Sequence, residues 1–326
     1  MRVKSQYFLQ SAIEGVVIQI KQEKRKIHLM GTVIDLTITH PTPNIVLDEV
    51  VRQLEMYEHR FSANDPSSEL SEINKNAGIH PVQVHPELFE LIQIGKKHSL
   101  APDSNMNIAI GPLVQSWRIG FEDARVLTNE EIKKLLQIID LDQVLLKENT
   151  VYLKMSGMAI DLGALAKGYI ADRIIDYLKS VGTQSALINL GGNLVTMGPA
   201  LQHSDRYWRI GIQNPVRTRG ASQMILRVQN KSVVTSGIYE RSLTKNGKTF
   251  HHILDSETGY PIKTDTASLT IVSDLSVDGE IWTTRLFGKT TEEIIYALNQ
   301  LSNIEGLVIN DKGEVFYSEG MNNLIL

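Results

Sequence analysis

The sequence of 326 residues contains no cysteine. Disulfide bonds, thiolate metal sites, a cysteine nucleophile and a lipid on an N-terminal cysteine are therefore excluded for the chain as given. Long apolar segments are missing as well, since no stretch approaches the roughly 20 apolar residues that span a bilayer. We therefore expect no stable insertion into a membrane.

A strong excess of charge is also absent. The 33 lysines and arginines nearly balance the 37 acidic residues, and the formal net charge is −4. This balance argues against nucleic acid or an anionic membrane surface as a partner. The hydrophobic fraction of 42% and the charged fraction of 21% are typical of a soluble globular protein.

The N-terminal segment has no apolar block followed by small residues, so it does not look like a secretory signal. As written, the sequence predicts a cytoplasmic protein. If a leader or an anchor precedes residue 1 in the natural protein, association with a membrane is the alternative.

Segments typical of strands and of helices are mixed along the chain without strict alternation. Alternating or β-branched apolar residues predict strands at 28–39, 158–162, 185–190, 232–236 and 267–272. Apolar residues at helical spacing predict helices at 45–59, 165–181 and 280–287. This order favours an α+β fold, with mixed or antiparallel sheets and packed helices, over a doubly wound parallel sheet. We expect residues 1–27 to be an N-terminal extension and residues 28–326 to form one two-lobed domain.

Polar residues gather between the later strands, in the runs 236–241 and 251–259. A globular chain seldom places so many polar residues there unless a charged ligand lies against them. The second run begins with His251 and His252, which in an extended segment point to opposite faces, so at most one points into a given site. Histidine suits a general base, although a hydrogen-bonded surface histidine is the plain alternative.

Glu280 and Thr284 are four residues apart in a predicted helix. On a helix this spacing puts both oxygens on one face, one turn apart, as a hard cation requires. Both are also ordinary polar residues of a helix surface. One carboxylate, one hydroxyl and one backbone carbonyl would leave coordination positions for phosphate oxygens, which is how Mg²⁺ is usually held. These segments together predict a site for a metal-bound phosphate ester.

Two further segments are rich in small residues. The junction at 161–169 contains Lys167 and free amides at a helix start, which favour an anion, but a tight turn for close packing explains it equally well. It matches neither the P-loop nor the GxGxxG pattern. At 189–193, a hairpin turn accounts for Gly191 and Gly192.

Six blocks of this sequence occur in the same order as in the ApbE family of FAD:protein FMN transferases, which the chain resembles. The blocks are Met-Gly-Thr at 30–32, then 61–74, 110–117, 161–172, 236–259 and the helix from Glu280. Any one block is weak, but the ordered set is specific and extends from about residue 28 to the C-terminus. The resemblance implies the α+β, T-fold-like architecture of that family. Its members bind FAD with Mg²⁺ and move the FMN half onto a threonine or serine of a target protein, releasing AMP.

The resemblance also implies roles for individual residues. Glu280, Thr284 and the carbonyl of Ala164 would bind Mg²⁺, and His252 would take the proton from the target hydroxyl. The residues that would bind FAD are Met30, Asn64, Ser71, Gly111, Asp161, Lys167, Ser236, Gly237, Glu240, His252 and Ile253. The acceptor protein would carry a sequence of the type Asp-x-x-Ser/Thr-Gly-Ala-Ser/Thr. This chain contains no such sequence, which argues against self-modification.

Two positions depart from the family pattern. Glu280 stands where the family usually has aspartate, so its carboxylate reaches further by one C–C bond and the metal would bind differently. Asn64 stands where many members have a tyrosine that would cover the flavin. Without that ring, water would reach the pyrophosphate, and an FAD pyrophosphatase that releases FMN and AMP is one alternative. A non-catalytic FAD-binding protein is another, and an interaction module with chance motifs is the third.

Overall fold

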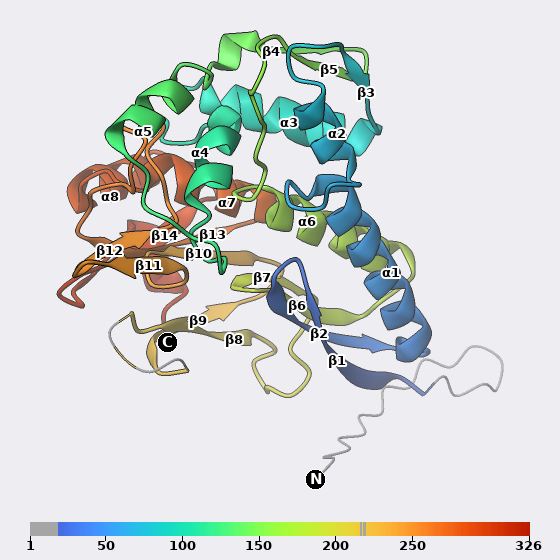
Figure 1. Cartoon of the computed structure of the whole chain (residues 1–326). Helices are drawn as coiled ribbons and strands as arrows, with labels where there is room; N and C mark the ends of the chain where they lie inside the picture. Colours follow the sequence, from blue (N-terminus) through green and yellow to red (C-terminus); the bar gives the residue numbers. More distant parts are fainter. Residues whose placement is uncertain (1–18, 216, 218–219) are drawn as a thin grey trace.

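A computed structural model describes residues 19–215, 217 and 220–326. Its centre is one eight-stranded sheet in which every neighbouring pair of strands is antiparallel (Figure 1). In spatial order the strands are β1 (Lys21–Leu29), β2 (Thr32–His40), β6 (Ser185–Leu190), β7 (Asn193–Met197), β10 (Ser232–Gly237), β13 (Thr266–Ser273), β14 (Glu305–Asn310) and β15 (Val315–Tyr317). The predicted α+β class with antiparallel sheets is confirmed.

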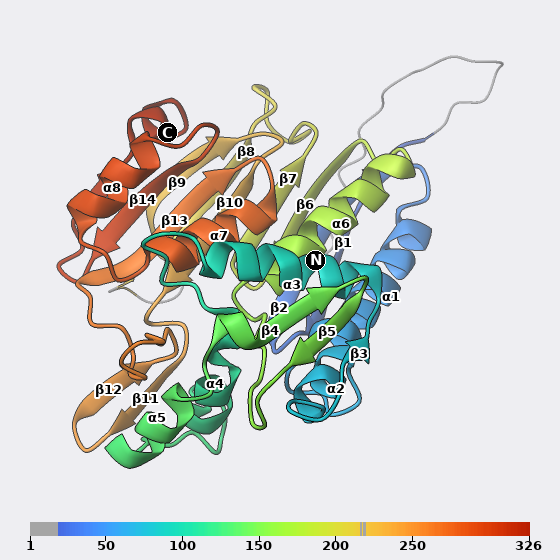
Figure 2. The ribbon, with the colours of Figure 1, turned by 90° about the horizontal axis from the view of Figure 1, so that it is seen from above.

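Helices cover one face of this sheet, as Figure 1 and Figure 2 show. The long ones are α1 (Pro43–Phe61), α3 (Pro86–Ser99), α6 (Ala166–Ser180), α7 (Ser276–Leu286) and α8 (Thr291–Asn299). Helix α1 buries Leu47, Val50 and Leu54, which recur every three or four residues and form one apolar stripe. The stripe packs with Leu36 and Ile38 of β2 in the main hydrophobic core.

The opposite face of the sheet is covered by a hairpin of β8 (Trp208–Gln213) and β9 (Ser222–Val228). Alternation explains both layers: Val233 of β10 packs against this hairpin, whereas its neighbour Val234 points to the helical face. None of the helices in the described ranges is long and apolar enough to cross a membrane.

Shorter elements lie around the helical layer. They are α2 (Glu69–Lys75), α4 (Gly111–Trp117), α5 (Asn129–Leu136), the small sheet of β3 (Val82–Gln83), β5 (Thr150–Leu153) and β4 (Val144–Lys147), the hairpin of β11 (Ser242–Lys245) and β12 (Lys248–His251), and the 3-10 turns Ile108–Ile110 and Leu141–Gln143. The 3-10 turn Glu319–Asn323 lies instead with the β8–β9 hairpin, where Met321 packs in the same core as Trp208 and Leu226. Trp117 at the end of α4 donates from Nε1 to the carbonyl of Gly259, 2.9 Å away. This bond ties the block at 110–117 to the block at 236–259.

The strand predicted at 28–39 is two strands. Met30 and Gly31 have φ of 52° and 65°, and they form the two-residue turn of the β1–β2 hairpin, where Leu29 pairs with Thr32. Two consecutive positive φ angles are what a type I′ hairpin turn requires. A non-glycine residue such as Met30 seldom adopts this conformation, so the alternation of apolar residues alone did not reveal the turn.

The predicted boundary after residue 27 is wrong for the segment at 21–27. These residues belong to β1, which pairs with β2 along its whole length, while residues 1–18 lie outside the described part of the chain. The basic residues at 21–26 made this segment look like a solvated extension, but β1 is an edge strand, and edge strands often carry lysine and arginine. Arg25 pairs with Asp48 of α1 at 2.6 Å, and Lys26 pairs with Asp35 of β2 at 3.1 Å.

The strand predicted at 158–162 is not a strand. Met158, Ile160 and Leu162 are buried as their alternation suggested, but no neighbouring strand pairs with them within the described residues. Instead, the side chain of Asn74 bonds to both backbone groups of Ile160, at 2.8 and 3.0 Å. A side-chain amide has thus taken the place of a ladder of backbone hydrogen bonds.

Candidate active site

Helices α6 and α7 pack closely where Gly168 faces α7. A Cβ atom at Gly168 would lie 2.6 Å from the carbonyl oxygen of Ser276 and 2.8 Å from Cγ of Glu280. Only glycine fits such a contact, because the nearest atoms include backbone. The packing explanation for this small-residue segment therefore holds at Gly168, and the contact brings Glu280 against the first turn of α6.

Glu280 is nearly inaccessible, with 4% of its surface exposed. Its Oε1 accepts a hydrogen bond from Nδ2 of Asn193 at 3.1 Å and lies 3.3 Å from Nζ of Lys167. Asn193 is itself fixed, since its Oδ1 accepts from the hydroxyl of Ser276 at 2.6 Å. Glu280, predicted as a metal ligand, and Lys167, predicted separately to bind FAD, are thus brought together, and Asn193 joins them without having been predicted.

Asn193 reaches this place through the turn between β6 and β7. Gly191 and Gly192 have φ of 65° and 98°, and the predicted hairpin turn at this position is confirmed. The turn delivers Asn193 to the helical face as the first residue of β7. The available signal was a polar residue directly after a Gly-Gly turn, but the sequence did not reveal its partner 87 positions away.

The start of α7 is fixed by Asp172 of α6. The carboxylate of Asp172 accepts hydrogen bonds from the backbone amides of Ser276 and Val277, at 2.8 and 2.9 Å. This cap from a neighbouring helix starts α7 at Ser276, four residues before the predicted start at Glu280. Burial raises the pKa of Asp172 to about 6, although the two amide hydrogen bonds oppose the shift.

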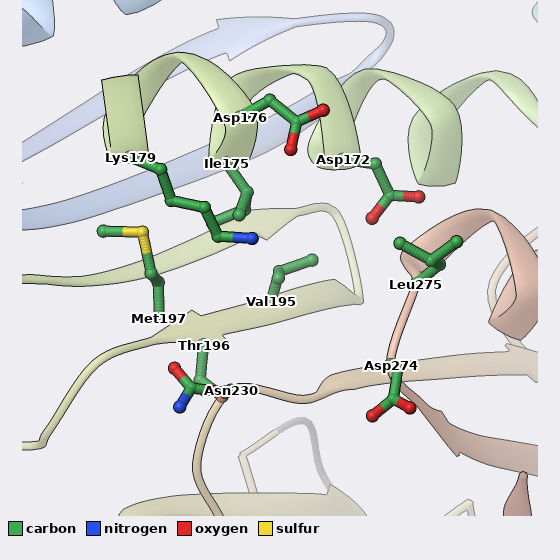
Figure 3. A pocket seen from close by; sticks show the side chains of 10 residues that line it. All are labelled: Asp172, Ile175, Asp176, Lys179, Val195, Thr196, Met197, Asn230, Asp274 and Leu275. Atoms are coloured by element: carbon green, nitrogen blue, oxygen red, sulfur yellow. The ribbon is translucent and has the colours of Figure 1, made fainter. Parts of the chain in front are cut away.

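Figure 3 shows Asp172 at the edge of a cavity of about 370 Å³ between α6, β7 and the connection from β13 to α7. Asp176 and Lys179 of α6 and Asp274 of the connection also line it. None of the residues predicted to bind FAD or metal does so. The cavity is therefore lined by other residues than the predicted FAD site, and Asp172, which lines it, also caps α7.

His251 and His252 bond to different neighbours. Nε2 of His251 is 2.9 Å from the carbonyl oxygen of Ile262, and Nδ1 of His252 is 3.2 Å from the carbonyl oxygen of Arg241. A carbonyl oxygen can only accept, so Nδ1 of His252 carries the hydrogen and its Nε2 keeps a lone pair. Burial lowers the pKa of His252 to about 4, and the positive charges of Arg241 and Lys167 add to this shift. His252 is therefore neutral at pH 7 and able to accept a proton at Nε2.

Arg241 lies between two glycine turns. A Cβ atom at Gly120, just after α4, would lie 2.8 Å from Cδ of Arg241, and one at Gly31 would lie 3.6 Å from its guanidinium. The β1–β2 turn is also bonded to α1, since Glu58 accepts a hydrogen bond from the backbone amide of Met30 at 2.6 Å. Arg241 belongs to the polar run at 236–241 but was not predicted as a site residue, because its neighbours come from distant turns.

Asp161 completes the charged cluster. Burial raises the pKa of its carboxyl, while a hydrogen bond from the amide of Gly163 at 2.8 Å and the charges of Lys167 and Arg241 oppose the shift. The same two cations act on His252. Asp161, Lys167, Arg241 and His252 are therefore electrostatic neighbours, although they come from segments 80 residues apart.

The other predicted residues are distributed around this cluster. Ala164 is exposed just before α6, and Thr284 is half-buried one turn after Glu280 on α7. Ser232, Val234 and Ser236 alternate along β10 and therefore lie on the same face of the sheet. This is the helical face, because Ser232 bonds to Ser276 and Val234 contacts Gly279 of α7. This register carries Ser236 towards the turn of α7 that holds Thr284.

Some predicted residues have evident packing roles. Gly111 begins α4 and lies against the backbone of Ala159, since a Cβ atom at Gly111 would be only 2.6 Å from the carbonyl oxygen of that residue. Gly237 is covered by the ring of Tyr239, and Ile253 packs in the core of α7 and α8. The hydroxyl of Ser71 donates to the carbonyl of Ser62 within the fold, at 3.4 Å.

Two of the residues predicted to bind FAD are exposed. Asn64 follows α1, and its Oδ1 accepts a hydrogen bond from Nε2 of Gln115 on α4 at 3.3 Å. Glu240 follows β10 and precedes Arg241. Their predicted contacts with FAD stay predictions, as does the contact of Ser71.

The oxygen donors of this site fit a metal ion that is held mainly by the phosphates of a bound nucleotide. Within the described ranges, no three histidine, aspartate or glutamate side chains are grouped so that they could hold a metal ion. Glu280 supplies one carboxylate, and both of its contacts are made by Oε1. Mg²⁺ keeps several waters and is commonly bound by one or two carboxylates plus substrate phosphates, so this poor set suits it when a pyrophosphate is present.

Comparison with known proteins identifies the family. The sequence profile of the ApbE family matches residues 30–308. The chain belongs to the ApbE family. It is 40% identical over 292 residues to an FAD:protein FMN transferase of Klebsiella pneumoniae, covering 89% of this chain and 90% of that protein. It is 32% identical to the FAD:protein FMN transferase of Treponema pallidum, covering 93% of this chain and 88% of the relative.

Solved structures of ApbE proteins share the fold. The ApbE protein of Thermotoga maritima superposes with a TM-score of 0.84 at 24% identity, covering 93% of this chain and 99% of that one. The flavin transferase ApbE of Vibrio cholerae superposes with a TM-score of 0.81 at 23% identity, covering 94% and 99%. The predicted architecture is therefore confirmed as that of ApbE proteins.

Proposed function

We propose that this ApbE protein is an Mg²⁺-dependent FAD:protein FMN transferase, which moves FMN from FAD onto a threonine or serine hydroxyl of another protein and releases AMP. The observation that carries the proposal is the neutral imidazole of His252, whose Nε2 keeps a lone pair and on which the charges of Lys167 and Arg241 act, together with the contact of Lys167 with Glu280 at 3.3 Å. The names of the relatives from Klebsiella and Treponema support the same activity.

The residues of this chain have separable tasks in such a reaction. An acceptor oxygen bonds to the phosphorus of the FMN half, the bond from that phosphorus to the AMP phosphate breaks, and the hydroxyl proton passes to Nε2 of His252. Lys167 and Arg241 bind and orient the charged pyrophosphate. Bound Mg²⁺ would supply charge neutralisation at the phosphates, with Glu280 and Thr284 and the carbonyl of Ala164 as its protein ligands.

The start of α6 adds to this electrostatic environment. Its first turn contains no acidic residue, and no side chain caps its amides at Leu165. Free amides and the positive end of a helix favour an anion. Binding of an anion at the start of α6 would thus agree with the proposal. It is compatible with the packing role of Gly168.

FAD pyrophosphatase activity is a second candidate, favoured by one observation. Asn64 is exposed, and its side chain bonds to Gln115 and offers no aromatic ring to cover a flavin. Water would then compete with the acceptor hydroxyl for the same phosphorus. In that case the same residues bind FAD and Mg²⁺, and only the attacking oxygen differs.

Chromatography of the nucleotide products separates these candidates. The protein is incubated with FAD and Mg²⁺, without and with an acceptor that carries the Asp-x-x-Ser/Thr-Gly-Ala-Ser/Thr sequence. For a transferase we expect AMP release to rise with the acceptor, without an equal amount of free FMN. Equal AMP and free FMN in both reactions would instead establish the pyrophosphatase. If the protein binds FAD but releases no AMP in either reaction, it is a non-catalytic FAD-binding protein.

A further inference from the structure

The starting point is the charge of Glu280 in the protein without ligand. Its side chain is 6% exposed, and an ionised carboxylate at such a depth needs a compensating positive charge. That charge is the ammonium of Lys167, 3.3 Å from Oε1. Lys167 lies on the turn of α6 that packs against Glu280, so this pair is built into the contact between the two helices.

The two oxygens of Glu280 are used differently. Asn193 and Lys167 both contact Oε1, and Asn193 is locked by Ser276. Among the described residues, no hydrogen bond to Oε2 accompanies them. Oε1 is thus anchored inside the protein, and Oε2 is the oxygen through which Glu280 can bind a cation.

Lys167 is placed to change partners. Its side chain is 30% exposed, and its ammonium is also 3.4 Å from the carbonyl oxygen of Gly163, at the junction before α6. It acts electrostatically on both Asp161 and His252. A long, flexible lysine at this position reaches either the buried carboxylate or an anion at the start of α6.

We propose that Lys167 is an internal counter-ion of Glu280, with which a divalent cation must compete, and that the pyrophosphate of FAD relieves this competition by drawing the ammonium onto itself. The inference deepens the proposed function and rests on it for the identity of the anion. A doubly charged ion and an ammonium repel each other strongly when both lie beside one poorly solvated carboxylate. Metal and nucleotide would therefore bind cooperatively, each raising the affinity for the other by the same factor.

The test measures metal binding without nucleotide, using Mn²⁺ as a spectroscopic probe and free Mn²⁺ detected by electron paramagnetic resonance at pH 8.5. Three variants of the full chain are compared with the wild type. Lys167→Met removes the charge and keeps the stem, Lys167→Arg keeps the charge, and Lys179→Met makes the same change of net charge at an exposed position of α6. Thermal unfolding of each variant verifies that it is folded.

We expect Lys167→Met to bind Mn²⁺ about tenfold more tightly than the wild type, because the competing cation is gone. Lys167→Arg and Lys179→Met should bind like the wild type. With metal removed by EDTA, Lys167→Met should bind FAD about tenfold more weakly, since it lacks a cation for the pyrophosphate. Loss of affinity for one ligand and gain for the other would distinguish a counter-ion from a residue that merely maintains the fold.

Equal or weaker Mn²⁺ binding by folded Lys167→Met would overturn the proposal. This comparison uses neither an acceptor nor FAD turnover, so it does not depend on whether the protein transfers FMN. If Lys167→Met binds Mn²⁺ no more tightly than the wild type, and the wild type does transfer FMN, then only the counter-ion role of Lys167 is refuted. The proposed function would still stand.

Discussion

The proposed chemistry depends on His252 as the base. The carbonyl of Arg241 fixes the hydrogen on Nδ1, and burial keeps the ring neutral down to a pKa of about 4. A histidine with its ordinary pKa of about 6.5 would be partly charged, and so partly inactive as a base, in mildly acidic solution. His252 instead keeps its lone pair throughout that range.

The pH dependence of the reaction follows from this pKa. We predict that kcat/KM for FMN transfer stays level from pH 7 down to about pH 5 and falls as the pH approaches 4, where Nε2 becomes protonated. The folded-state pKa lies below the unfolded value, so this group also makes the protein less stable as the pH falls from about 6.5 to 4. Rates are measured only where circular dichroism shows folded protein. An acid limb centred near 6.5 would exclude His252 in this environment as the base.

Glu280 can be tested by removing its charge and keeping its shape. Glu280→Gln retains an oxygen for Asn193 but loses the carboxylate, so we expect FAD turnover to become insensitive to added Mg²⁺ and to fall at least 10²-fold. The matched control is Glu292→Gln, an exposed glutamate in the first turn of α8. Activity of Glu280→Gln that still rises with Mg²⁺ would move the metal site elsewhere.

Sequence motifs pointed to individual residues of the candidate site, but not to the residues that contact them. Glu280, Lys167 and His252 stand in recognisable blocks, and the structure brings the first two within 3.3 Å. Asn193 and Arg241 were missed because their importance depends on contacts across the fold, with Glu280 in one case and with the turns at Gly31 and Gly120 in the other. No local pattern encodes such a contact.

At the level of elements, α7 is positioned by a cap that another helix supplies. Asp172 bonds to the amides of Ser276 and Val277 and so extends α7 by one turn before Glu280. Spacing within the sequence could predict the helix but not this start, because α7 has no capping side chain of its own at Leu275. The segment at 158–162 is a second case. Its alternating apolar residues are buried as in a strand, but its backbone bonds to the side chain of Asn74 in α2, which the sequence did not indicate.

Loss of this cap should weaken the fold and the site together. We predict that Asp172→Ala lowers the free energy of unfolding by about 1–2 kcal/mol, in the range of helix caps, and reduces FAD turnover because α7 carries Glu280 and Thr284. Urea unfolding measures the first effect. Asp176→Ala is the control, since this exposed aspartate one turn later forms a surface pair with Arg173 at 3.1 Å, and surface pairs contribute little. Equal stability of the two variants would show that the cap is dispensable.

Under the proposed function, Asn64 in the loop between α1 and α2 would set how readily water reaches the pyrophosphate. We predict that Asn64→Tyr binds FAD about fivefold more tightly, as expected for aromatic stacking worth ~1 kcal/mol, and releases less free FMN when no acceptor is present. Asn323→Tyr, at an exposed position near the C-terminus, is the control. Both quantities come from fluorescence titration and product chromatography. Unchanged hydrolysis in Asn64→Tyr would mean that water does not enter through this side.

At the scale of the whole molecule, the fold brings together blocks that lie far apart in sequence. Arg241 lies beside the β1–β2 turn at Gly31, Lys167 and Arg241 both act electrostatically on Asp161 before α6, and Lys167 lies 3.3 Å from Glu280 of α7. The α+β class could be predicted because antiparallel sheets tolerate irregular order of strands and helices. The order of the eight strands could not, because pairing between distant strands leaves no periodic signal in either one.

The central claim is that this chain transfers FMN to a protein hydroxyl. Its most direct test is the intact mass of an acceptor carrying the Asp-x-x-Ser/Thr-Gly-Ala-Ser/Thr sequence, after incubation with the protein, FAD and Mg²⁺. We predict one added FMN per acceptor, lost when His252→Ala replaces the wild type and when alanine replaces the modified serine or threonine. An acceptor whose mass stays unchanged while FAD is cleaved to FMN and AMP would contradict the claim.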